Sequence, residues 1–150
     1  MRCFIFILIA FSFSSPSHSA VEVSAWSRAT PPGGTSAAIY GRFINKGDDS
    51  LTLKSVSVDF ADHAIVHDSD YRDGIASMKK GELVIPATHA VELKPDSKHI
   101  MLMGLDKGLI EGCTYAFRLN WSDGSASLHR FLTGGLAQMA EPEVSTIKSC

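Results

Sequence analysis

TYAFRLNWSDGSASLHRFL, residues 114–132, is the stretch of this 150-residue chain that decides the class of fold. Two runs rich in β-forming residues, Thr114–Trp121 and Ser125–Leu132, flank Ser122-Asp123-Gly124. An Asp-Gly pair between two such runs is a strong signal for a β-hairpin. This part of the chain therefore predicts two antiparallel strands joined by a tight turn.

Outward from this hairpin, the chain reads as further short β segments separated by turn signals, of which Pro31-Pro32-Gly33-Gly34 is the clearest. A change of phase near Ser55 suggests a β-bulge in one segment. The sequence shows no long, well-capped stretch with helical periodicity. The other segments expected as strands are Val21–Trp26, Ala37–Ile44, Leu51–Val58, Ala64–His67, Leu83–Ile85, Ala90–Leu93 and Ile100–Leu105.

Many short strands with regular turn signals are typical of a β-sandwich or β-barrel. The sequence therefore predicts one all-β domain of about eight strands over residues 20–133. A C-terminal tail follows at residues 134–150, where there is little β pattern. No internal repeat or linker divides the chain further.

The first nineteen residues differ from the rest and have the plan of a secretory signal peptide. Arg2 supplies a positive start, residues 3–13 (CFIFILIAFSF) are almost wholly apolar, and small residues follow. Cleavage after Ser19 would place Ser17 and Ser19 at the positions that the peptidase reads. The apolar run is shorter than the roughly 20 residues of a membrane-spanning helix. We therefore expect an exported protein without stable membrane insertion.

The charge balance argues against nucleic acid as a partner, because 14 basic and 16 acidic residues give a net charge of −2 with no dense basic stretch. Two cysteines, Cys113 and Cys150, follow the expected signal peptide. An oxidising compartment permits a disulfide between them. The sequence cannot place them within bridging distance, so free thiols or an intermolecular bond remain open.

The chemistry of the chain lies in the placement of histidine and methionine. The pattern is His67-x10-Met78-x20-His99-x-Met101. In a strand, residues i and i+2 point to the same face, so His99 and Met101 can present imidazole and thioether side by side. His67 ends another expected strand, and Met78 lies in the stretch beyond it.

These donors suit copper(I). Thioether sulfur is a soft neutral ligand that selects Cu(I), and imidazole binds copper in either oxidation state. Zinc would instead recruit Cys, His or carboxylate ligands. The alternative reading makes Met78 and Met101 packing residues and makes His67 and His99 ordinary strand histidines.

The other candidates support different chemistry less well. A blue-copper site needs a cysteine beside its histidines, and Cys113 has no nearby histidine. No nucleophile-elbow or comparable motif indicates a hydrolase, so no catalytic residues are expected. His63 and His89 lie beside turn residues and are expected at the surface, and His129 is expected to have a structural role.

The spacing of His67, Met78 and the H-x-M triplet resembles the signature of the PCuAC family of periplasmic copper chaperones. The resemblance extends from about Val21 to Leu132. Its other blocks are residues 25–33 (AWSRATPPG), residues 37–40 (AAIY), residues 85–87 (IPA), residues 91–95 (VELKP) and residues 99–105 (HIMLMGL). The stretch between Met78 and His99 is one residue shorter than is usual in the family. The methionines that often follow the first histidine are replaced here by Asp68-Ser69-Asp70-Tyr71, whose carboxylates we expect to be solvated.

The resemblance implies a cupredoxin-like β-barrel that binds one Cu(I) per chain through His67, Met78, His99 and Met101, with Cu(II) as a second oxidation state to test. It implies a copper chaperone, not an enzyme, that passes copper to the CuA centre of a haem-copper oxidase or to a Sco-type protein. Two rival functions stay open from the sequence: a metal-free exported β-sandwich binding module, and a copper storage or tolerance protein.

Overall fold

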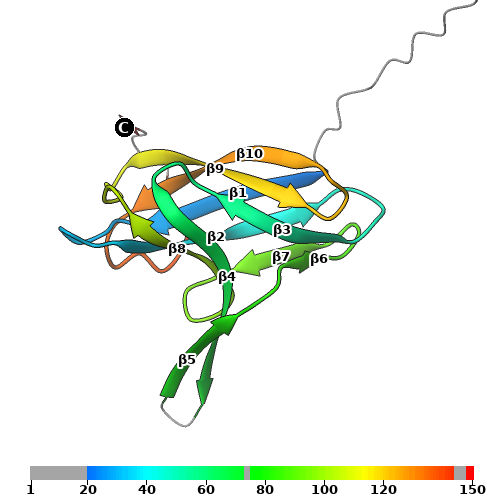
Figure 1. The fold of residues 1–150 in the computed structure, drawn as a ribbon, viewed down its shortest axis with the longest axis horizontal. Helices are drawn as coiled ribbons and strands as arrows, with labels where there is room; N and C mark the ends of the chain where they lie inside the picture. The colour runs from blue at the N-terminus through cyan, green and yellow to red at the C-terminus, as the bar shows by residue number, and fades with distance from the viewer. Residues whose placement is uncertain (1–19, 73–74, 144–147) are drawn as a thin grey trace, which may run out of the picture.

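The computed structural model of the protein describes residues 20–72, 75–143 and 148–150. These residues contain no helix, and their strands join into one continuous sheet (Figure 1), so the prediction of an all-β fold is confirmed. The expected signal peptide, residues 1–19, lies outside the described residues. In the described part there is accordingly no helix long and apolar enough to cross a bilayer.

Eleven strands occur in the described residues, more than the expected number of about eight, and eight of them have six residues or more. The eight longer strands are β1 (Val21–Arg28), β2 (Ser36–Asn45), β3 (Leu51–Ser57), β4 (Ala61–Arg72), β5 (Ile75–Lys80), β8 (His99–Leu105), β9 (Cys113–Trp121) and β10 (Ala126–Gly134). The three short ones are β6 (Val84–Ile85), β7 (Ala90–Leu93) and β11 (Lys148–Ser149).

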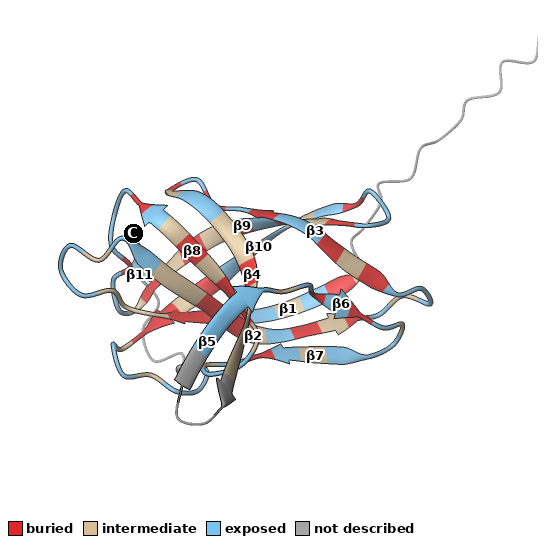
Figure 2. Ribbon diagram, turned by 60° about the horizontal axis from the view of Figure 1, so that its bottom comes forward, coloured by how far each residue is buried: buried red, intermediate tan, exposed pale blue. Residues whose placement is uncertain are grey.

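The sheet runs in the order β5-β4-β8-β2-β1-β10-β9-β3-β6, with β7 beside β2 and β11 beside β9. The strands β4 and β3 are far apart in this order, yet Val66 of β4 and Val56 of β3 belong to the same buried cluster. The sheet therefore encloses a single core. Phe43, Phe117 and Phe131 are among the largest side chains in this core. Figure 2 shows how buried positions alternate with exposed ones along the longer strands. The sheet thus closes over its own inner face as a sandwich.

The predicted hairpin is present, since β9 and β10 are antiparallel neighbours on either side of Asp123 and Gly124. Asp123 Oδ1 accepts a hydrogen bond of 2.9 Å from the Ser125 amide and so holds the turn. The predicted irregularity in β3 is also present. The register of β3 against β9 shifts between Leu53 and Ser55.

Gly41 lies where β2 changes from one pairing partner to another. The first part of β2 pairs with β8 and the second part pairs with β7. The φ of Gly41 is +139°, and a Cβ at this position would lie 2.0 Å from the Ser24 carbonyl oxygen. Only glycine permits so close an approach of β1 and β2.

The β4–β5 hairpin is the main departure from the sequence prediction. We expected the fourth strand to end at His67 and Met78 to lie in a connection. Instead β4 continues to Arg72, and residues 67–72 pair with β5 (residues 75–80). Figure 1 shows this hairpin as an arm that projects from the body of the sheet. The polar stretch Asp68-Ser69-Asp70 has low intrinsic β propensity, so the strand depends on pairing that the local sequence does not reveal.

The C-terminal tail is attached to the body at several points, although its sequence has little β pattern. Cys150 forms a disulfide with Cys113, with the two Cα atoms 5.7 Å apart. Lys148–Ser149 runs parallel to the start of β9. Arg28 donates a hydrogen bond of 2.6 Å from Nε to the Gln138 carbonyl oxygen. The pairing of the two cysteines, which the sequence left open, is therefore an intrachain one.

Candidate metal centre

The pairing of β4 with β8 brings the two candidate histidines together. His67 lies directly opposite His99. Met101 lies opposite Ile65, two residues further along the same pair of strands. Directly opposed residues of antiparallel strands share a face of the sheet. The ring centres of His67 and His99 are 5.9 Å apart and the ring planes are almost perpendicular, at 86°.

The β4–β5 arm adds the fourth candidate, Met78. Met78 lies opposite Ser69, and Lys80 lies opposite His67. Because side chains alternate along a strand, Ser69 and Met78 share the face that carries His67. Met78 and Met101 are therefore diagonal neighbours of His67 from opposite sides, within the reach of long side chains. The four residues predicted as ligands come from three adjacent strands and share one face.

The tautomer of His99 is fixed by its surroundings. His99 is only 6% exposed, and its Nδ1 is 2.9 Å from the Ser97 carbonyl oxygen. A carbonyl only accepts, so Nδ1 carries the hydrogen and the Nε2 lone pair remains available to an ion. The same carbonyl accepts a hydrogen bond of 3.2 Å from the Ser69 amide, which ties the turn before β8 to β4. Ser97 thus orients His99, a role that no sequence signal indicated.

His67 carries an unusual buried atom. Its Nδ1 is one of three buried side-chain nitrogen or oxygen atoms without a hydrogen-bond partner in the described part of the chain. A buried polar atom in this state costs about 1–3 kcal/mol, so native structures seldom keep one without a purpose. A neutral imidazole resolves this cost when it binds a metal ion. The observation fits a ligand role for His67.

The spacing of the two rings fits a shared ion. With a metal–nitrogen bond of about 2.0 Å, the centre of a coordinated imidazole lies roughly 3.2 Å from the metal. Two rings on one ion can therefore be at most ~6.4 Å apart, and the observed 5.9 Å is within this limit. No group of three His, Cys, Asp or Glu side chains in the described residues is placed to hold an ion. The candidate centre consequently depends on the thioether sulfur atoms.

The solvent exposure of the four residues is graded. His99 is buried, His67 and Met101 are partly buried, and Met78 on the arm is 63% exposed. The centre is thus closed around His99 and most open at Met78.

The aromatic residue Tyr40 packs next to His99, with Trp26 next to Tyr40, and the sequence did not predict these contacts. The Tyr40 ring lies 6.1 Å from the His99 ring and 4.8 Å from the Trp26 ring, between centroids. Burial raises the pKa of Tyr40, the positive charge of Arg28 opposes this shift, and Asp96 adds to it. Tyr40 therefore stays a neutral phenol near neutral pH and adds no charge to the centre.

The carboxylate beside His67 points away from the centre. Asp68 is adjacent to His67 in β4, so its side chain lies on the opposite face. It forms an ion pair of 2.6 Å with Lys98, and both groups are partly buried. We had expected Asp68 to be solvated; in the structure it is paired instead. Lys80, which lies opposite His67 and is exposed, is a charged group on the His67 face.

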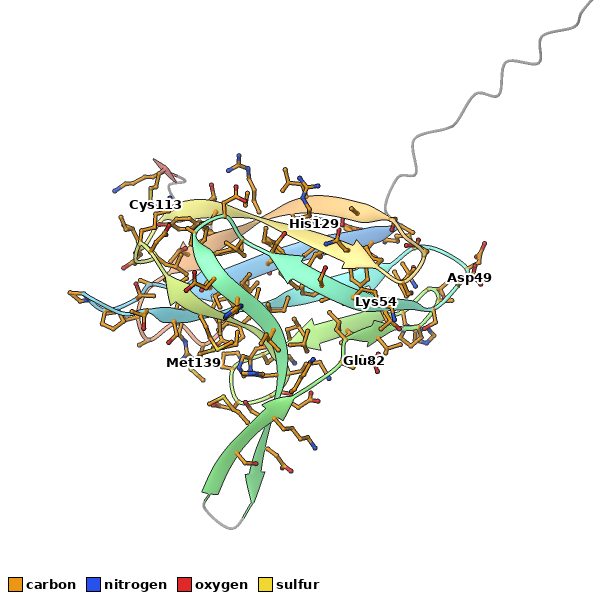
Figure 3. All side chains as sticks on the ribbon, viewed as in Figure 1. Asp49, Lys54, Glu82, Cys113, His129 and Met139 are labelled. Carbon is orange, nitrogen blue, oxygen red and sulfur yellow. A yellow bond between two sulfur atoms is a disulfide. The ribbon has the colours of Figure 1, made fainter. Side chains whose placement is uncertain are left out.

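The other three histidines of the described residues lie outside the candidate centre. His89 is exposed, with Nδ1 2.7 Å from the Ala87 carbonyl oxygen. His129 lies on β10, with Nε2 2.8 Å from the Ser127 hydroxyl, in agreement with a structural role. His63 is exposed on β4 and lies opposite Met103. In Figure 3, His129 lies on the body of the sheet, away from the β4–β5 arm.

Solved structures with this architecture are PCuAC domains. A copper-bound PCuAC domain from PmoF2 is 17% identical with a TM-score of 0.65, over 77% of this chain and 93% of that chain. The apo PCuAC domain from PmoF1 is 20% identical with a TM-score of 0.66, over 77% and 94%. At these identities the likeness shows the fold alone. The Cu(I) form of DR1885 from Deinococcus radiodurans is 29% identical with a TM-score of 0.61, over 75% and 76%.

These matches define the class of fold, a PCuAC-type β-sandwich, and confirm the resemblance drawn from the sequence. The chain belongs to the LpqE-like family, described as "Putative lipoprotein LpqE-like", whose model matches residues 21–129. It is also 34% identical over 110 residues to the "Putative lipoprotein Lxx21020" of Leifsonia xyli subsp. xyli. That match covers 71% of this chain and 65% of the relative, so the chain spans somewhat less than two thirds of the relative's length.

Proposed function

We propose that this protein is an exported copper chaperone that binds one Cu(I) through His67, Met78, His99 and Met101. The observation that carries the proposal is the opposed pair His67 and His99, with Met101 and Met78 on the same face. Two neutral imidazoles and two neutral thioethers form a donor set that prefers soft, singly charged copper. The copper-bound form of DR1885, a related protein, supports the choice of metal.

The exposure gradient suggests how the ion leaves. Copper is cargo in this proposal, and the protein performs no covalent reaction. Met78, on the projecting arm, is the donor that an acceptor's ligand displaces first, because it is the most exposed of the four. His99, buried and held by Ser97, is the last to release. Stepwise exchange of this kind transfers the ion without releasing it to water.

The compartment of the protein and the acceptor of its copper are also part of the proposal. We propose the periplasm as the compartment and, by resemblance to PCuAC chaperones, the CuA centre of a haem-copper oxidase or a Sco-type protein as the acceptor. The Cys113–Cys150 disulfide supports an oxidising compartment. Copper storage is the competing use of the same site, and only a transfer assay separates the two.

The test is an anaerobic Cu(I) competition titration of residues 20–150 against a strong chelator. Wild type should withdraw one equivalent, and His99→Ala/Met101→Ala should not. His89→Ala/Met139→Ala removes one histidine and one methionine that are not proposed ligands and should behave as wild type. If wild type and the His99/Met101 variant compete equally, the centre is not a copper site and the metal-free binding module becomes the better description.

A further inference from the structure

A second histidine–methionine pair lies on the same face of the sheet as the candidate centre. His63 on β4 is directly opposite Met103 on β8, four residues along each strand from the pair formed by His67 and His99. His63 is exposed and Met103 is partly buried. From the sequence, His63 is expected at the surface and Met103 is not expected to be a ligand.

Met101 lies midway between the two pairs. It is opposite Ile65, and His67 and His63 are each two residues from Ile65 along β4. The two histidines are therefore the diagonal neighbours of Met101, one on either side. Diagonal neighbours in an antiparallel sheet are within reach of long side chains. Methionine has three rotatable side-chain bonds and adapts readily to different partners. One thioether can therefore face either histidine.

The neighbouring strand leaves the two sulfur-bearing side chains of β8 accessible. Ser36 of β2 lies opposite Met103, and Ala38 lies opposite Met101. Both are small and cover little of the adjoining methionines. Along this face β8 thus presents His99, Met101 and Met103 in succession, with His67 and His63 across from the two ends.

The chemistry of the His63–Met103 pair matches that of the candidate centre. Opposed side chains have Cβ atoms about 4.5–5.5 Å apart, so an imidazole and a thioether at these positions can coordinate the same ion. Both donors are neutral, and thioether sulfur selects Cu(I). With two donors of its own, one of them exposed, this pair should bind more weakly than a four-donor centre.

We propose that His63 and Met103 form a second, weaker Cu(I) site, and that Met101 is a ligand common to both sites. Copper would then have a staging position at Met103, two residues along β8 from Met101, whose thioether exchanges partners between the two sites. The staging role rests on the proposed function, whereas the second site itself does not.

The experiment is an anaerobic Cu(I) titration of residues 20–150 against a weak competing ligand, followed by NMR of methyl-labelled methionines. Wild type should bind two equivalents, the second at least tenfold more weakly. The first equivalent should shift Met78 and Met101, and the second should shift Met103. His63→Gln/Met103→Leu keeps side-chain size and should lose only the second equivalent. His89→Gln/Met139→Leu is the matched control and should keep both.

Retention of the second equivalent by His63→Gln/Met103→Leu, or a Met103 methyl that never moves, would overturn the proposal. His67→Ala/His99→Ala separates this inference from the proposed function. If that variant binds nothing and wild type binds one equivalent without a Met103 shift, the chaperone centre stands and the second site is rejected. If that variant and wild type both bind one equivalent that shifts Met103, the second site stands and the four-ligand centre is rejected.

Discussion

His67 and His99 face each other across β4 and β8, with ring centres 5.9 Å apart and ring planes at 86°. The strands hold this relationship through their main-chain pairing, and the Ser97 carbonyl fixes the tautomer of His99. Sites built on paired strands are held more accurately than sites built on loops. Half of the proposed centre is therefore preorganised, whereas Met78 reaches it from the projecting arm.

Met78→Leu should weaken Cu(I) binding about tenfold or more without a measurable change in folding stability. Met78 is 63% exposed, so its loss removes a donor but little buried surface. Anaerobic chelator competition and urea unfolding measure the two effects. Met139→Leu is a close control, because Met139 is 61% exposed and is not one of the proposed ligands. Equal affinities for the two variants would show that Met78 is not a ligand.

His67→Leu should raise the stability of the copper-free protein by about 1 kcal/mol, because it removes a buried nitrogen without a partner. His99→Leu should lower it, because the bond to Ser97 is lost. Both variants should lose the stabilisation that Cu(I) gives to wild type. Urea unfolding with and without Cu(I) measures all these differences. A copper-free His67→Leu variant less stable than wild type would contradict the interpretation of the unpaired Nδ1.

Cys113→Ala/Cys150→Ala should lower the free energy of unfolding by about 4 kcal/mol, because the disulfide closes a chain segment with a sequence separation of 37. The bond ties the tail to β9 and touches no residue of the candidate centre. Cu(I) affinity should therefore stay within a factor of about 2–3 of wild type, a change well below 1 kcal/mol. Denaturant unfolding and chelator competition test these statements, and a large loss of affinity would mean that the tail supports the centre.

The copper-free protein should become less stable as the pH falls through about 6.5, and His129 should account for part of this. Burial lowers the pKa of His129, so the unfolded chain takes up the proton at higher pH than the folded protein does. Unfolding is therefore increasingly favoured on acidification. Urea unfolding from about pH 8 to about pH 5 should show a shallower decline for His129→Gln than for wild type. Parallel curves would assign the decline to other groups.

Much of the fold could be read from local sequence signals. The Asp123-Gly124 turn, the proline and glycine stops and the short apolar runs predict strands because each acts through its own backbone preference. The β4–β5 arm could not be predicted in this way. Its strands are polar and gain their order from pairing with each other, so propensity gives no signal.

The sequence by itself determined the all-β class and the four candidate donors, because turn chemistry and donor softness are properties of the residues themselves. Only the tertiary structure decided that His67 lies opposite His99, that Met78 joins their face from a third strand, and that Met101 lies between two histidines. Strand register depends on which strands become neighbours and how they align. It is fixed by packing over the whole sheet, and a shift of one residue would turn every donor to the other face.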